Sequence, residues 1–318
     1  MKHFPVVIVG GGPAGAACAG QLVREGLDCV ILDKVKFPRP KVCAGWIPPD
    51  IFNNLGILPS QYPCDLSEFS SLSISLGGFP VTLRGTQYAI RRVEFDDWLL
   101  NQSGATFIQH NVKNIQRTSG GYRIDDLFSA DYIVGAGGTH CPVYQGYFKD
   151  KYPRQGSQIA ALEEEYRFGW TDPSCRLWFF KDRLPGYAWY VPKKGGYVNI
   201  GIGGNARVVV ERGNSIKEHW DRFLGFLQDT GLINNREFHP KGYTYFLRGS
   251  NDQPRIDNLF LIGDSAGLST LDMGEGIGPA IQSGLLAARS ILNGSEYSLA
   301  DIPRFSLLPK AFHWMINL

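Results

Sequence analysis

Residues 6–15 read VVIVGGGPAG, so an apolar run leads directly into three glycines at G-x-G-x-x-G spacing. This pattern predicts a tight turn at Gly10 from a buried strand into a helix. It also predicts a close approach of backbone to a ligand at Gly12 and close packing of helix on sheet at Gly15. The free N–H groups at the start of such a helix suit a pyrophosphate.

The flanking residues are those of a βαβ unit. Residues 4–9 predict a buried parallel strand, residues 14–26 a helix and residues 27–33 a second strand. Asp33 ends the second strand, where a carboxylate accepts hydrogen bonds from the ribose of an adenine dinucleotide. We therefore predict a dinucleotide site rather than a glycine-rich turn of an ordinary α/β protein.

Charge and cysteine usage restrict the partners and the compartment. The 32 basic and 30 acidic residues give a net charge of +2, and no basic run is present, so we expect no nucleic acid partner. The six cysteines lack metal-ligand spacing, which predicts no metal site and a reducing, cytoplasmic environment.

Membrane contact and oligomeric state are less constrained. No apolar stretch has the length that a transmembrane helix needs, so we predict no membrane span. The apolar residues 305–318 favour a tail packed on the fold, with peripheral contact to a membrane surface as the alternative. The sequence does not indicate an oligomeric state.

The pattern changes from alternating strands and helices to antiparallel β structure at about residue 151. Residues 68–90 also read as a hairpin that turns at Gly77-Gly78, and residues 258–267 return to a buried strand. We therefore predict a discontinuous dinucleotide-binding domain with an inserted β-sheet substrate domain. The expected bounds are 1–62, 88–150 and 252–318 for the first domain, and 63–87 and 151–251 for the second.

Two further glycine-rich segments follow. Residues 201–206 offer a second G-x-G-x-x-A, but the β-branched residues after it predict no helix to bind a phosphate. Asp264 follows the strand at 258–263, where its carboxylate can accept hydrogen bonds from ribityl hydroxyls. The glycines at 274–278 keep backbone amides bare at a helix start. Alone this is a capped helix; paired with the first motif it indicates FAD.

Together these segments resemble flavoproteins of the p-hydroxybenzoate hydroxylase fold, and within them the geranylgeranyl reductase family. The resemblance extends over nearly the whole chain. It implies a Rossmann-like α/β domain that binds FAD and an antiparallel sheet that holds the substrate. The segments that carry it are GGGPAG (10–15), PKVCAG (40–45), RVEFDDWL (92–99), PGYAWYVP (185–192), VNIGIGG (198–204), GDSAG (263–267) and GEGIG (274–278).

The resemblance also implies cofactor contacts. Arg92 would pair with a phosphate, the alternative being a surface arginine at a helix start. Val112, expected at the end of its strand, would meet the adenine through its backbone. The full set of implied FAD contacts is Gly10, Gly12, Pro13, Ala14, Gly15, Asp33, Lys34, Cys43, Ala44, Gly45, Arg92, Val112, Gly263, Asp264, Gly274, Gly276 and Ile277.

Tyr187 and Trp189 alternate on a predicted strand and so share one face. The resemblance implies that this face lines a substrate pocket over the flavin; the alternative is an aromatic core between sheet and helix. Cys43 is either a redox or acid group at the flavin or a small loop residue. Further aromatic residues of this region favour an apolar ligand: Trp178, Phe179, Phe180, Tyr190 and Phe246.

These observations predict an FAD-dependent oxidoreductase. The favoured reaction reduces carbon–carbon double bonds of an apolar, isoprenoid-like substrate, with NAD(P)H as a transient electron donor and an acid that the sequence does not identify. One alternative is an FAD-dependent monooxygenase, which is disfavoured because Gly137-Gly138 stands where hydroxylases of this fold have Asp-Gly. The other alternative is a non-catalytic FAD-binding redox sensor.

Overall fold

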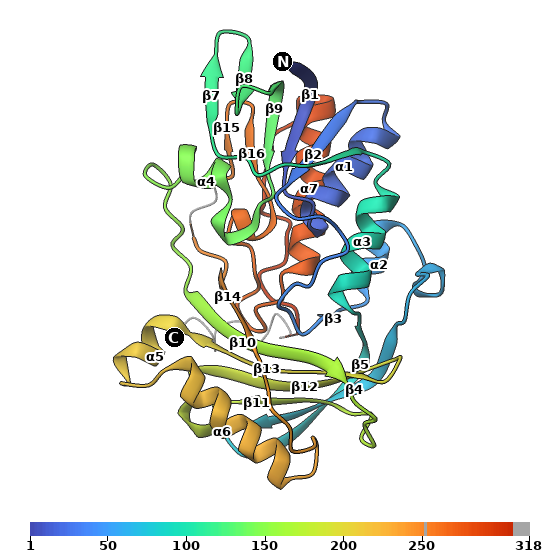
Figure 1. Cartoon of the computed structure of the whole chain (residues 1–318), viewed down its shortest axis with the longest axis vertical. Helices are drawn as coiled ribbons and strands as arrows, with labels where there is room; N and C mark the ends of the chain where they lie inside the picture. The colour runs from blue at the N-terminus through green and yellow to red at the C-terminus, as the bar shows by residue number, and fades with distance from the viewer. Residues whose placement is uncertain (251–252, 308–318) are drawn as a thin grey trace. The chain divides into compact units, whose positions relative to one another are not determined.

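The computed structural model describes residues 1–250 and 253–307, and the chain divides into two compact units (Figure 1). The first unit comprises residues 1–39, 93–156 and those from Tyr245 onward; the second comprises residues 40–92 and 157–244. Residues 40–62 and 88–92 thus differ from the predicted assignment, because strand β3 (Trp46–Ile47) pairs with β5 (Phe79–Ala89) in the second unit. Residues 151–156 and 245–250 fall in the first unit instead.

The first unit is built on a sheet of order β15-β16-β9-β1-β2-β6, in which β16, β9, β1, β2 and β6 run parallel. The carboxyl ends of these strands therefore lie at one edge, where α/β sheets bind their ligands. An antiparallel ribbon of β7 and β8 joins through β9. The strands are β1 (Lys2–Val9), β2 (Cys29–Asp33), β6 (Thr106–Gln109), β7 (Ile115–Thr118), β8 (Gly121–Ile124), β9 (Phe128–Gly135), β15 (Arg255–Ile256) and β16 (Leu259–Leu261).

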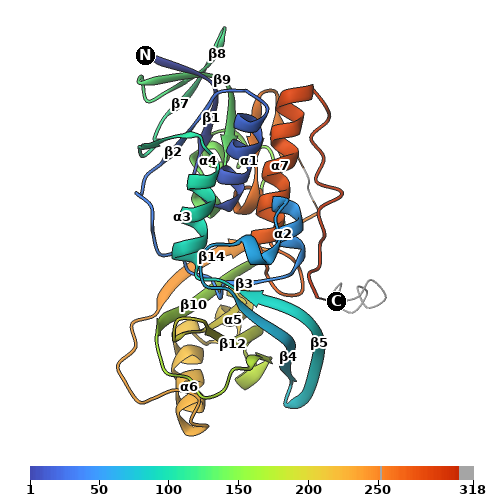
Figure 2. The same cartoon turned by 90° about the vertical axis from the view of Figure 1, so that its right-hand side faces the viewer.

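Helices α1 (Pro13–Arg24) and α7 (Ile277–Asn293) lie side by side against the first sheet (Figure 2). They approach closely because Gly284 of α7 has no side chain: a Cβ there would lie 2.3 Å from the carbonyl oxygen of Ala14. Apolar side chains of α4 (Pro142–Tyr147) and of the β7–β8 ribbon pack in a second cluster. The unit also contains α3 (Arg92–Gln102), except for its first residue, and the short 3-10 turns η2 (Gly138–His140) and η4 (Gly263–Ser265).

The second unit contains a sheet of order β14-β10-β13-β12-β11-β4-β5-β3. Neighbouring strands are antiparallel wherever their register is defined, except that β11 runs parallel to β4. The predicted hairpin at 68–90 is present as β4 and β5. Besides β3 and β5, the strands are β4 (Ser67–Leu76), β10 (Gln158–Arg167), β11 (Cys175–Phe179), β12 (Gly186–Lys193), β13 (Tyr197–Asn205) and β14 (Lys241–Phe246).

Helix α6 (Ile216–Asp229) covers one face of this sheet. Its side chains Trp220, Phe223 and Leu227 are buried in one cluster with Tyr190 of β12 and Ile200 of β13. Ser215 and Glu218 form a capping box that satisfies amides at its start. The unit also has α2 (Asp50–Leu55), η1 (Pro59–Gln61), η3 (Lys181–Arg183) and α5 (Ala206–Glu211).

Helix α5 corrects one prediction. Residues 206–211 are helical, although their β-branched sequence predicted no helix. The side chain of Asn205 accepts a hydrogen bond from the Val208 amide and so caps the first turn, which outweighs the weak intrinsic propensity. The preceding glycines lie inside β13 rather than in a turn.

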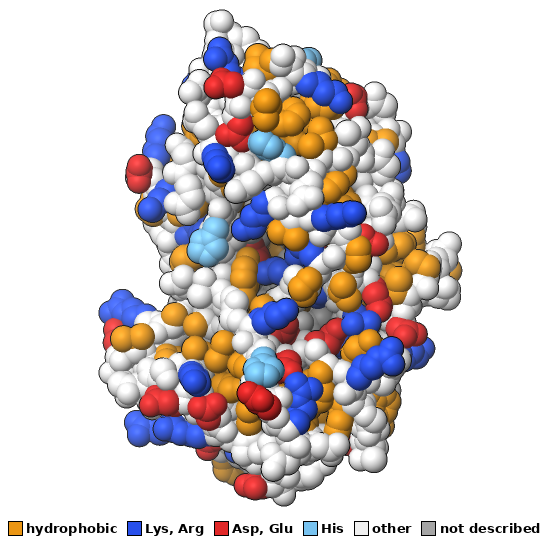
Figure 3. Space-filling view, in the orientation of Figure 1, with side chains coloured by type: hydrophobic (Ala, Val, Ile, Leu, Met, Phe, Trp, Pro, Cys, Tyr) orange, Lys and Arg blue, Asp and Glu red, His pale blue; other side chains and the backbone are white. Residues whose placement is uncertain are grey.

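Within the described ranges, no helix is long and apolar enough to cross a membrane. Basic and acidic side chains are interspersed over the face shown in Figure 3. Of the apolar segment 305–318, residues 308–318 lie outside the described residues. Its start packs on the fold, because the Asp272 carboxylate accepts hydrogen bonds from the amides of Ser306 and Leu307.

Candidate functional site

The fingerprint turn of the first unit has space only for glycine at two positions. Gly10 has φ +117°, and a Cβ there would lie 2.3 Å from the carbonyl oxygen of Ala136 on the neighbouring chain segment. A Cβ at Gly15 would lie 2.0 Å from the carbonyl oxygen of Gly10. These contacts give the predicted tight turn and close helix packing their physical cause.

Gly12 is different, because a Cβ there would meet one atom at ordinary contact distance and no atom closer. The nearest atom to a Cβ at Gly12 is a guanidinium nitrogen of Arg39, at 3.6 Å. Gly12 is the N-cap of α1, Pro13 follows it, no side chain caps the helix, and its first turn carries no acidic residue. Amides at a helix start that no side chain caps, with a guanidinium nearby, fit a phosphate group.

Arg39 is a basic residue at this helix start that the sequence analysis did not select. Its guanidinium lies over the ring of Phe37, 4.7 Å from the centroid, and 3.7 Å from the buried carboxylate of Asp96. The side chain retains 17% exposure. It therefore places a guanidinium group, paired with Asp96, beside Gly12. The sequence feature that could have indicated Arg39 was its place as a cation in the proline-rich loop after the second strand.

Asp33 ends β2 as predicted, and its two carboxylate oxygens accept hydrogen bonds from the Gly11 amide at 2.8 Å and the Val35 amide at 3.0 Å. It thus connects the glycine turn to the chain after β2. Lys34 is exposed. The expectation for Val112 was wrong in position: β6 ends at Gln109, and Val112 follows it with its side chain in the apolar core.

The second motif lies next to the first within the same unit. Gly263 begins η4 with φ +57°, and a Cβ there would lie 3.1 Å from that of Ala14 in α1. An oxygen of Asp264 lies 3.3 Å from where a Cβ of Gly276 would stand, so this carboxylate is at the start of α7. Gly274 also has no room for a side chain, since a Cβ would lie 2.4 Å from the hydroxyl of Tyr245. The starts of α1 and α7, far apart in sequence, therefore flank Asp264.

In the second unit, Tyr187 and Trp189 share the face of the sheet opposite α6. Their ring centroids are 5.7 Å apart, and Phe179 stacks on Tyr187 at 5.0 Å. The alternative of an aromatic core between sheet and helix is therefore wrong for this pair. It holds instead for Trp178 and Tyr190, which pack with α6.

The glycines of β13 make room for Trp189. A Cβ at Gly201 would lie 2.2 Å from the indole ring, so the ring lies directly over this residue of the neighbouring strand. The indole N–H donates a hydrogen bond of 2.7 Å to the side-chain oxygen of Asn199. The G-x-G-x-x-A pattern at 201–206 thus has a packing explanation: it seats an aromatic side chain.

Asn199 connects this aromatic pair to a buried carboxyl group that the sequence analysis did not select. Its amide nitrogen donates hydrogen bonds to a carboxyl oxygen of Glu163 at 2.5 Å and to the backbone oxygen of Cys43 at 3.3 Å. Glu163 is 7% exposed, and burial raises its pKa to about 7, although Asn199, Lys193 and the Cys43 amide oppose the rise. The signal was its place in an alternating strand: Glu163 is on the same face as Trp189.

Comparison with known proteins agrees with this geometry. A family model described as FAD binding domain matches residues 3–57. Digeranylgeranylglycerophospholipid reductase 3 of Methanosphaera stadtmanae is 26% identical over 96% of this chain and 82% of its own length. Menaquinone reductase of Mycolicibacterium smegmatis is 25% identical over 93% of this chain and 78% of its own length. A solved geranylgeranyl bacteriochlorophyll reductase-like protein of Thermoplasma acidophilum aligns with TM-score 0.79 and 22% identity, covering 94% of this chain and 81% of that one.

The chain is an FAD-dependent oxidoreductase. The predicted resemblance to the geranylgeranyl reductase family is confirmed by these relatives, and the predicted fold class is confirmed by the solved structure. The donors around Gly12 and the carboxylate of Asp264 fit FAD, whose phosphates need backbone amides and whose ribityl hydroxyls need an acceptor.

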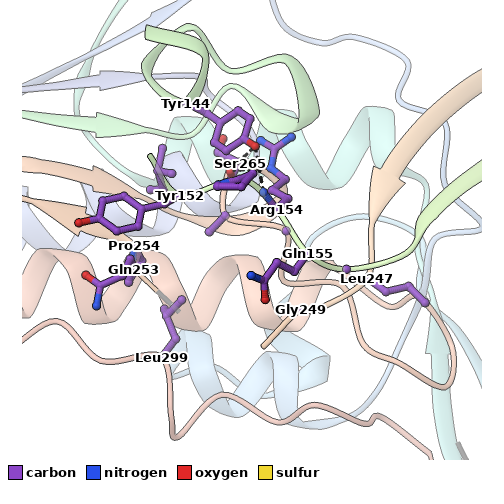
Figure 4. A pocket seen from close by; sticks show the side chains of 15 residues that line it. Tyr144, Tyr152, Arg154, Gln155, Leu247, Gly249, Gln253, Pro254, Ser265 and Leu299 are labelled. Atoms are coloured by element: carbon purple, nitrogen blue, oxygen red, sulfur yellow. Dashed lines mark hydrogen bonds between the residues drawn. The ribbon is translucent and has the colours of Figure 1, made fainter. Parts of the chain in front are cut away.

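Arg154 of this oxidoreductase holds the Asp264 turn from a small pocket in the first unit (Figure 4). Its guanidinium donates two hydrogen bonds to the backbone oxygen of Ser265, at 2.7 and 3.2 Å, and a third to that of Thr139. It also lies 3.6 Å from the ring centroid of Tyr144. Because Ser265 follows Asp264 directly, Arg154 fixes the turn that carries the carboxylate.

The oxidoreductase also has a buried ion cluster beside the loop of Gly45. The ammonium of Lys193 donates to Glu165 at 2.6 Å, and Arg91 donates to the other oxygen at 2.9 Å. Burial opposes ionisation of Glu165, but the two cations lower its pKa below the usual range. Gly45 has φ +70° and lies against Lys193, so only glycine fits. Arg92 is buried, which makes the surface alternative wrong.

Glu275 is a second buried carboxyl group in the oxidoreductase, 6% exposed at the start of α7. It accepts a hydrogen bond of 2.8 Å from the Gly278 amide, so it occupies part of the helix start that Gly276 and Ile277 were expected to offer to the cofactor. Burial raises its pKa to about 7, and the charges of Asp272 and Asp264 add to the rise, against the backbone donors.

Replacing Glu275 with glutamine is expected to stabilise the oxidoreductase at pH 8 but not at pH 4. Above pH 4.5 the carboxyl ionises in the unfolded chain while it stays protonated in the folded one up to about pH 7, so stability falls across this window. In the wild type the free energy of unfolding should therefore fall by about 3 kcal/mol across this window, and this fall should be absent from the variant. Urea unfolding at several pH values measures it. The exposed Glu296→Gln is the control, and an identical pH dependence of wild type and Glu275→Gln would contradict the assignment.

Proposed function

We propose that this protein reduces carbon–carbon double bonds in the polyprenyl chain of a lipid, with NAD(P)H as the electron donor. The relatives named for digeranylgeranylglycerophospholipid and for menaquinone support a substrate with such a chain, since both compounds carry one. The face formed by Phe179, Tyr187 and Trp189 supports it independently, because aromatic side chains present a large apolar surface to an alkene chain.

The chain's own residues divide into two tasks under this proposal. In the first unit, the amides at the start of α1, with Arg39 beside them, hold the phosphates of FAD, and Asp264 accepts from its ribityl hydroxyls. When bound, FAD supplies the hydride that adds to one carbon of the double bond. In the second unit, Tyr187 and Trp189 orient the alkene.

Glu163 supplies the proton that the second carbon requires. It is on the face of Tyr187 and Trp189, and a pKa of about 7 keeps a substantial fraction of the carboxyl protonated near neutral pH, where a general acid must act. Asn199 fixes the orientation of the carboxyl group, because its amide binds Glu163 while its oxygen is held by Trp189. This observation carries the proposal: one buried, oriented acid next to an aromatic surface. Cys43 is the other candidate acid.

Anaerobic stopped-flow spectroscopy tests the function. We expect NADPH or NADH to bleach the flavin absorbance, and a prenyl lipid to restore it without oxygen, with a product two hydrogens heavier by mass spectrometry. Reoxidation that requires oxygen and gives a hydroxylated product would establish a monooxygenase instead. A flavin that no nicotinamide donor reduces would favour a redox sensor.

A further inference from the structure

An exposed apolar group of side chains lies around the turn of the β4–β5 hairpin and just after β11 in the second unit. Phe79 is 76% exposed, Phe180 58%, and Leu76 and Val81 47% each. We call these four residues the tip patch. Exposing large apolar side chains as a group is unfavourable in water, so a surface of this kind indicates a partner.

The backbone brings the four residues together. Leu76 pairs with Phe79 across the Gly77-Gly78 turn of the β4–β5 hairpin, which forms a long curved ribbon (Figure 2). The Gly77 amide donates to the backbone oxygen of Phe179 at 3.2 Å, which places Phe180 beside this turn. The tip patch is therefore one surface built from two loops of the sheet.

The charges around the tip patch favour an anionic lipid surface. Residues 69–87 contain one charged side chain, Arg84, and the loop after Phe180 adds Lys181, Asp182 and Arg183. An apolar tip with a surplus of cations matches a bilayer, in which aromatic and aliphatic side chains enter the headgroup boundary while cations meet acidic headgroups.

The tip patch is continuous with the aromatic face. By strand register, Leu76 pairs with Phe179, Phe179 with Tyr187, and Leu177 with Trp189, so all these side chains point to the same face of the sheet. Exposure falls along this row from 47% at Leu76 to 5% at Trp189. An apolar chain that leaves a bilayer at the tip patch therefore meets apolar side chains along the whole row.

We propose that the tip patch docks the protein on an anionic lipid bilayer, and that the row from Leu76 through Phe179 and Tyr187 to Trp189 receives a lipid chain drawn from it. The docking follows from the exposed residues and their charges. That this lipid chain is the one reduced beside Trp189 rests on the proposed function.

Vesicle flotation with the full chain tests the docking. We expect the wild type to float with vesicles of phosphatidylcholine and phosphatidylglycerol at low salt, and less with phosphatidylcholine alone or at high salt. The double variant Phe79→Ser, Phe180→Ser should bind the anionic vesicles at least about tenfold more weakly. The control is Leu58→Ser, Leu127→Ser, two residues that are 64% and 53% exposed outside the tip patch and should change nothing.

Three results would overturn the docking. One is a wild type that does not float, and another is a tip-patch variant that floats as well as the wild type. The third is a wild-type dimer by light scattering that the tip-patch variant converts to a monomer without any vesicle binding, which would make a second copy of this chain the partner.

A turnover measurement separates this inference from the proposed function. The tip-patch variant should reduce a short, water-soluble prenyl phosphate at the wild-type rate and lose activity on a prenyl lipid embedded in vesicles. Equal activity of variant and wild type on the embedded lipid would contradict the entry path. If neither protein reduces any prenyl compound, the proposed function fails, while flotation still decides the docking.

Discussion

Replacing Gly12 with valine is expected to weaken FAD binding by at least about a hundredfold while leaving the protein folded. A Cβ here would meet no atom closer than a guanidinium nitrogen of Arg39 at 3.6 Å, the end of a flexible side chain, so we expect the fold to accept valine. The valine methyl groups would instead fill the space in front of the first α1 amides, where the phosphates must approach. Isothermal titration of the flavin-free protein with FAD, together with circular dichroism, measures both effects.

Two further glycine variants serve as controls for Gly12→Val. Gly225→Val, in the middle of α6, where a Cβ would meet no atom within 4 Å, should leave FAD affinity unchanged. Gly15→Val should lose both FAD and stability, because its Cβ would lie 2.0 Å from the Gly10 carbonyl oxygen. A Gly12→Val protein that keeps its yellow colour and affinity would place the phosphates elsewhere.

Replacing Glu163 with glutamine is expected to slow reduction of the double bond by about 10²–10⁴-fold, the usual contribution of a general acid. Glutamine keeps the shape and can still accept from Asn199, so the loss reports the missing proton. Flavin reduction by NAD(P)H should proceed at the wild-type rate, since no proton from Glu163 is needed in that half-reaction. Single-turnover kinetics of each half-reaction separates the two.

The pH profile distinguishes an acid from a residue that only supports the fold. In the wild type, reoxidation by the alkene should slow as the pH rises through about 7, where Glu163 loses its proton. The Glu163→Gln variant should lack this decrease in rate at high pH. Glu164→Gln is the control. Glu164 is on the other face of β10 and accepts hydrogen bonds from Arg236 and the His239 amide. This variant should therefore keep both the wild-type rate and its decrease at high pH. A Cys43→Ser variant that alone removes this decrease would transfer the acid role to Cys43.

Local patterns in the sequence predicted much of the architecture. The βαβ unit, the hairpin at Gly77-Gly78 and the amphipathic helix α6 follow from periodicity and turn residues, which act over a few positions. The shared face of Tyr187 and Trp189 followed from strand alternation. The unit bounds near residues 40–62 did not follow from local patterns, because that segment joins the second unit through the pairing of β3 with β5.

The residues that the sequence analysis missed share one property: burial and long-range contact create their chemistry. Glu163 and Glu275 look like ordinary acids in sequence, and burial, with smaller contributions from neighbouring carboxylates, raises the pKa of each to about 7. Arg39 lies beside Gly12 only because the loop after β2 returns to the glycine turn. No local pattern encodes such contacts.

The sequence by itself determined the kind of cofactor. Glycines that avoid close contacts, together with acids at strand ends, leave a readable pattern, because a phosphate cradle is a local backbone property. Only the tertiary structure decided which acid stands beside the aromatic surface, which arginine lies beside Gly12, and that the row from Trp189 ends in an exposed apolar tip. Those features depend on which strands pair and which side chains lose water, and both are set by segments far apart in the chain.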